Sequence, residues 1–268
     1  MQIRPAAVAG AFYPAQPETL AHDIAALLQQ AKQSDATSWP KAIIAPHAGY
    51  IYSGPIAASV YARLQSARDT VRRVVLLGPV HRVPVRGLAL PGVEAFATPL
   101  GVVALDQQAI TEISDLPQVM ESPAAHAWEH SLEVQLPFLQ TVLDDFKLVP
   151  LAVGDATTEE VAEVLERLWG GPETLIVVSS DMSHFLPYDE AQQVDRATAQ
   201  AILNLRGPLT HEQACGGTPV NGLLLAARRH KLNPRLLDLR NSGDTAGDKD
   251  RVVGYAAFDF MEETGHAL

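Results

Sequence analysis

Three histidines in this chain lie just beyond apolar runs that the sequence predicts as buried strands. They are His47, His81 and His184, and the apolar runs are residues 42–45, 71–79 and 174–180. In an open α/β sheet, the carboxyl ends of parallel strands meet at one edge, where ligands bind. Imidazole nitrogens bind iron, copper and zinc, and they also transfer protons. The spacing therefore predicts a metal or acid/base site at this edge of the sheet.

Two more residues are candidates for the same site. Asp181 precedes His184 by three residues and could act as a ligand or orient that histidine. Cys215 adjoins two glycines, so its backbone can approach a neighbouring segment closely. Two imidazoles, a thiolate and a carboxylate could hold iron, zinc or copper. Cys215 could equally be a small, inert buried residue, and a closed structural zinc site is a further alternative.

Further side chains are expected to shape the pocket around these groups. His130 and Glu133 are three residues apart on a predicted helix, so both could face one cleft, although a surface ion pair is the alternative. Tyr52 lies close to His47 in sequence and supplies a hydroxyl. Arg82 and Arg86, beside His81, could bind an anion.

Composition limits the classes of partner. The chain has 268 residues and a net charge of -11, which disfavours nucleic acid or an anionic membrane as the main partner. A single cysteine excludes an internal disulfide and predicts a reducing compartment. The first residues do not resemble a signal peptide, and no apolar run is long enough to span a membrane. We therefore expect a cytoplasmic protein.

Strands and helices alternate along the chain, which predicts one α/β layer sandwich over residues 1–268. Residues 115–128 are expected to be irregular, and residues 128–139 are expected to form a helix with a kink or a start at Pro137. The predicted strands, besides the three above, are 87–90, 102–105, 146–153, 235–239 and 252–260.

Five short motifs together carry a family resemblance. They are Ala45–Tyr50, Gly78–His81, Glu129–Glu133, Ser179–His184 and Cys215–Gly216. In this order they resemble the Memo family, whose prokaryotic members are called AmmeMemoRadiSam system protein B, and the resemblance spans about residues 3–260. It implies a fold similar to the class III extradiol dioxygenases of the LigB type. These are αβα enzymes with a central, mixed, largely parallel sheet and non-haem Fe(II).

The resemblance also implies roles for individual residues. His47, His81 and Cys215 match the positions at which Memo proteins bind Fe(II) or copper, with zinc a further option. His184 matches the acid/base histidine, and Asp181 lines the same pocket. Independently of the resemblance, we expect His130, Glu133 and Tyr52 to shape the pocket and bind the substrate.

Cys215 stands where the dioxygenases have a carboxylate ligand. A thiolate is softer and oxidisable, which disfavours ring cleavage of catechols and leaves redox or oxygenase-like chemistry on an unknown substrate. The alternative is a non-catalytic module that binds a phosphopeptide or another anionic ligand. The implied partners are a small molecule or peptide, with a functional link to an AMMECR-like protein and a radical SAM protein.

Overall fold

A nine-stranded mixed sheet forms the centre of the computed structural model, which describes residues 2–31 and 38–262. The strand order is β10-β12-β2-β9-β3-β8-β4-β7, and β11 pairs with β12. The strands of this sheet are β2 (Ala42–Ala45), β3 (Arg73–Pro79), β4 (Leu88–Leu90), β7 (Val119–Glu121), β8 (Lys147–Val153), β9 (Thr174–Ser179), β10 (His184–Leu186), β11 (Asn233–Asn241) and β12 (Val252–Met261). The neighbours β2, β9, β3 and β8 are parallel, as the sequence predicts for βα repeats.

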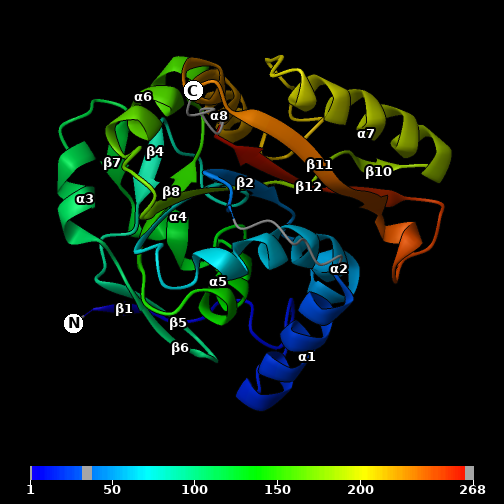
Figure 1. The fold of residues 1–268 in the computed structure, drawn as a ribbon, viewed down its shortest axis with the longest axis horizontal. Helices are drawn as coiled ribbons and strands as arrows, with labels where there is room; N and C mark the ends of the chain where they lie inside the picture. Colours follow the sequence, from blue (N-terminus) through cyan, green and yellow to red (C-terminus); the bar gives the residue numbers. More distant parts are fainter. Residues whose placement is uncertain (1, 32–37, 263–268) are drawn as a thin grey trace, which may run out of the picture.

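Helices cover both faces of this sheet (Figure 1), so the predicted αβα arrangement is confirmed. Helices α1, α2 and α5 lie on one face, and α6, α7 and α8 lie on the other. The helices are α1 (Pro17–Gln30), α2 (Tyr50–Tyr61), α3 (Gln107–Ile113), α4 (Pro123–Ala127), α5 (Leu136–Val142), α6 (Thr158–Arg167), α7 (Tyr188–Leu203) and α8 (Gly217–Arg229). Within the described residues, no helix combines the length and the apolar character needed to cross a membrane.

The two cores follow from the alternation of side chains along each strand. In β2, Ile43 and Ala45 pack on the face with α1 and α2, whereas Ala42 and Ile44 pack on the face with α6 and α8. Because both faces are covered, this strand is apolar at every position.

The parallel pairing of β2, β9 and β3 sets the position of the predicted site. Ala45 pairs with Ser179, and Leu77 pairs with Val178, so the carboxyl ends of the three strands lie at one edge. His47, Asp181 and His81 follow these strand ends. The ends of these three strands therefore meet at one edge of the sheet, as the sequence predicts.

The middle of the chain differs from the sequence-based expectation. Residues 115–128 contain β7 and α4 rather than only irregular structure. His130 lies outside helical structure, just before a turn at Ser131 and Leu132, and the helical conformation begins only at Glu133 with the 3₁₀ helix η2 (Glu133–Gln135). Pro137 occupies the first turn of α5. A separate three-stranded sheet also forms from β1 (Ile3–Arg4), β5 (Ala95–Thr98) and β6 (Gly101–Ala104).

Candidate metal centre

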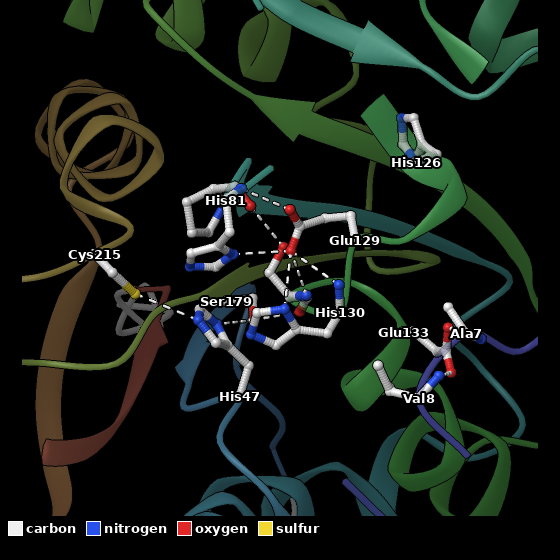
Figure 2. A network of polar contacts seen from close by, with 12 residues as sticks. Ala7, Val8, His47, His81, His126, Glu129, His130, Glu133, Ser179 and Cys215 are labelled. Carbon is white, nitrogen blue, oxygen red and sulfur yellow. Dashed lines mark hydrogen bonds and ion pairs between the residues drawn. The ribbon is translucent and has the colours of Figure 1, made fainter. Parts of the chain in front are cut away.

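A cluster of three histidines lies at the edge of the sheet. One ring nitrogen each of His47, His81 and His130 lies within 4.8 Å of the others, which is compatible with a shared metal ion. Cys215 Sγ is 3.3 Å from Nε2 of His47, on the side of the cluster where α8 begins (Figure 2). The structure thus places Cys215 against His47 and adds His130 to the two predicted histidines.

The hydrogen bonds of Ser179 decide which nitrogen of His47 can bind a ligand. The Ser179 hydroxyl donates its single proton to the carbonyl of Ser131 at 2.6 Å. It must therefore accept from Nδ1 of His47, 2.8 Å away. Nε2 is left with a free lone pair, directed toward Cys215.

Glu129 fixes the other two histidines of the cluster. Its Oε1 lies 2.8 Å from Nδ1 of His81 and 3.3 Å from Nδ1 of His130, and its Oε2 accepts the backbone N–H of His81. Burial alone would raise the pKa of this carboxyl, but the hydrogen bonds from His81 and from backbone N–H groups hold the pKa at about 2. The carboxylate therefore keeps Nδ1 of His81 protonated and leaves Nε2 free, as in many histidine metal sites.

Glu129 also shapes the turn that carries His130. Oε1 accepts the backbone N–H groups of His130 and Ser131 at 2.9 and 3.0 Å. Gly78 in β3 lets this turn approach the sheet, because a Cβ there would lie 2.8 Å from Oγ of Ser131. The sequence interpretation missed Glu129 and Ser179 as supporting residues; their only signal is that each adjoins a candidate residue or strand end.

His184 lies beside the cluster in a cavity of about 610 Å³ that is also lined by His81, Cys215 and His211. Its Nδ1 donates to the carbonyl of Met182 at 2.9 Å, which leaves Nε2 as a free proton acceptor. Burial lowers the pKa of His184, so the neutral ring is favoured.

The side chain of Asp181 contacts the backbone of His47 and does not contact His184. Its Oδ1 accepts the backbone N–H of His47 at 2.7 Å, and its own N–H points to Sγ of Cys215 at 3.3 Å. Burial raises the pKa of Asp181 to about 7. No hydrogen bond joins Asp181 to His184, so the described structure gives no support to the predicted orienting role.

Burial favours the neutral form of three buried groups at the site, His47, His130 and Cys215. It lowers the pKa of His47 well below its usual value, and the neighbouring histidines lower it further. It also lowers the pKa of His130 to about 4. Burial and the nearby Asp181 raise the pKa of the Cys215 thiol. The imidazoles of His47 and His130 can therefore bind a cation without first losing a proton, whereas Cys215 would have to lose its proton on binding one.

Two predicted pocket residues point elsewhere. Glu133 is fully buried, and its carboxylate binds Arg4, Tyr13 and the backbone of the N-terminal segment instead of facing His130. The expected common cleft for His130 and Glu133 does not form, because the turn that follows His130 directs the two side chains apart (Figure 2).

Tyr52 lines a different cavity, beside Phe12 and Ile51. The guanidinium of Arg86 donates two hydrogen bonds to the carboxylate of Glu160, at 2.7 and 2.9 Å. It therefore pairs with Glu160 rather than with an anion near His81.

Sequence comparison identifies the family. The family model described as "Memo-like protein" matches residues 4–259. The chain belongs to the Memo family. A MEMO1 family protein of Aquifex aeolicus is 38% identical over 97% of this chain and 100% of its own length. A MEMO1 family protein of Archaeoglobus fulgidus is 34% identical over 94% of this chain and 97% of its own length.

A solved structure supports the fold of this Memo-family chain. An uncharacterized protein from Escherichia coli K12 superposes with a TM-score of 0.51, covering 83% of this chain and 100% of that chain. The two sequences are 16% identical, so the similarity concerns the fold alone.

Proposed function

We propose that this Memo-family protein binds one transition-metal ion through His47, His81 and Cys215 and uses it for redox or oxygenase-like chemistry. The observation that supports this most is the pairing of a free imidazole nitrogen of His47 with the thiol of Cys215 at 3.3 Å. Two ligands at about 2.0 and 2.3 Å from a tetrahedral ion lie about 3.5 Å apart, so the observed separation suits a shared metal. His130, which belongs to the same cluster, is the competing third donor.

Fe(II) is the metal that we propose, with copper and zinc as the competing ions. Imidazoles and a thiolate suit all three, so the donor set selects a class of metal rather than one element. When bound, an iron or copper ion would exchange electrons with a substrate or O₂ and polarise it.

The protein's own groups would bind and orient the substrate and move a proton. His184 lines the cavity that Cys215 also lines, and the hydrogen bond of its Nδ1 leaves Nε2 available, so Nε2 would accept a proton from a substrate bound there. Asp181 would act as a positioning residue, because it holds the backbone of His47. The similarity to extradiol dioxygenases and the links to an AMMECR-like and a radical SAM protein remain predictions.

Metal analysis of the anaerobically purified protein tests this proposal. We expect close to one iron per chain in the wild type and loss of the metal in His47→Ala and Cys215→Ala. His211→Ala is a matched control, because His211 lines the same cavity but is exposed and outside the cluster. After cobalt substitution, a thiolate-to-metal charge-transfer band should be present in the wild type and absent from Cys215→Ala.

The outcomes separate the ligand sets. If Cys215→Ala retains its metal and His130→Ala loses it, the three histidines are the ligands and our assignment of Cys215 is wrong. If the metal-free protein binds phosphopeptides tightly and metal does not change the affinity, the site is a binding module instead.

A further inference from the structure

Arg63, which is not part of the histidine cluster, is a buried cation with incomplete hydrogen bonding. It lies in the 3₁₀ helix η1 (Ala62–Ala67) that follows α2, and its side chain is 8% exposed. Nη2 has no hydrogen-bond partner within the described chain, and neither does Nε. Guanidinium N–H groups that lose water without gaining an acceptor are costly, so the described residues leave the Arg63 cation incompletely compensated. Because Nε and Nη2 are themselves closed off from solvent, a ligand in an adjoining cavity would meet the third nitrogen, Nη1.

The nearest carboxylate is already occupied by another arginine. Asp259, which is fully buried, accepts hydrogen bonds from Nε and Nη2 of Arg235 at 2.9 and 2.5 Å. Its Oδ2 is also 3.3 Å from Nε of Arg63, at ion-pair distance but without the alignment of a hydrogen bond. Asp259 therefore compensates one of these two cations and leaves the other in need of an anion.

Arg63 lines a cavity of about 520 Å³ between α1, α2 and β11. A register shift in β11 between Leu236 and Asp238 interrupts the alternation of its side chains. Leu236, Leu237 and Asp238 consequently all line this cavity, although they are consecutive in the sequence. The cavity shares no lining residue with the one beside His81.

The walls of the cavity combine one net positive charge with an apolar surface. Asp238 and Arg240 form an ion pair, and Asp238 also accepts from Ser59 at 3.1 Å. Among the residues that the structure describes here, the three arginines 63, 235 and 240 face two carboxylates, which leaves one positive charge at Arg63. Leu27, Pro55 and Leu237 supply the apolar part of the wall.

We propose that this cavity binds a small monocarboxylate with a short apolar chain. Its carboxylate accepts a hydrogen bond from Nη1 of Arg63 and balances the remaining charge. Its hydrocarbon part lies on the apolar wall, where it is removed from water. The site is separate from the proposed metal centre and does not depend on it.

Titration calorimetry of the full chain with sodium hexanoate tests the proposal. We expect saturable binding of one hexanoate per chain, and binding at least about tenfold weaker for Arg63→Gln, because a charged hydrogen bond is lost. Arg68→Gln is the matched control: it removes a nearby arginine whose ion pair with Asp144 is exposed, and it should bind as the wild type does. Hexanol, which has the same chain without the charge, should not bind measurably.

A second variant keeps Arg63 and closes the cavity. Ala31 lines the cavity and is partly exposed, so Ala31→Phe should fold normally and lose hexanoate binding. The proposal is wrong if the wild type does not bind hexanoate, or if hexanol binds equally well. It is also wrong if both Arg63→Gln and Ala31→Phe bind hexanoate like the wild type.

Discussion

A substitution at Glu129 tests whether this carboxylate orients His81 and His130 for metal binding. Glu129→Gln keeps the size of the side chain but removes its charge and one of its two acceptor oxygens. Oε1 accepts from three N–H groups and Oε2 from one, at 2.7–3.0 Å. The amide must therefore direct an NH₂ group at at least one of these donors, including Nδ1 of His81 or the backbone of the turn.

The expected loss of metal affinity follows from the contact with His81. Replacing the carboxylate partner of a ligating histidine lowers metal affinity about 10- to 100-fold, which corresponds to about 1.4–2.8 kcal/mol. The metal-free fold should lose about 1–3 kcal/mol in addition, because buried donors lose their acceptor. Competition with a coloured chelator measures the affinity, and urea unfolding of the metal-free protein measures the stability.

Glu133→Gln is the control for this experiment. Glu133 belongs to the same sequence motif and is equally buried, but it pairs with Arg4 at 2.7 Å and contacts no histidine of the cluster. This variant should lose about 3–5 kcal/mol of stability, because Arg4 stays buried without its counter-charge, and its metal affinity should be unchanged. Wild-type affinity in Glu129→Gln, or an equal loss in Glu133→Gln, would refute the supporting role of Glu129.

Two more predictions concern stability. Burial lowers the pKa of His126 to about 4, below the value of about 6.5 expected in the unfolded chain. The unfolded state therefore binds more protons than the folded state between these two pH values. The free energy of unfolding falls by about 3 kcal/mol from this group as the pH falls from about 6.5 to 4. Urea unfolding at each pH should show a smaller decrease of this free energy for His126→Gln than for the wild type. Gly216→Ala should cost about 1–3 kcal/mol, because its Cβ would lie 2.8 Å from the backbone oxygen of Ser179. Gly49→Ala, whose nearest contact is 3.6 Å, should be nearly neutral, and equal thermal stability of the two variants would contradict this account.

The sequence alone predicts the sheet edge and the first members of the site. Apolar runs that end in Pro46-His47, Val80-His81 and Ser180-Asp181 mark strands and the residues just beyond them. Parallel βα units then place these strand ends together, because the helix between two strands returns the chain to the edge at which the previous strand began. The capping box of α6, formed by Thr157 and Glu160, is equally local and was also predictable.

The tertiary structure alone decides which neighbours complete the site. The direction of the side chains of His130 and Glu133 depends on a turn that Glu129 holds through its backbone hydrogen bonds, and no periodicity in the sequence encodes that turn. Glu133 is directed into the core by Arg4, a residue 129 positions away. Such long-range pairings depend on the packed arrangement of segments, whereas strand ends depend on local hydrophobic pattern. The sequence therefore predicts where a site can form, and the packing determines which side chains it contains.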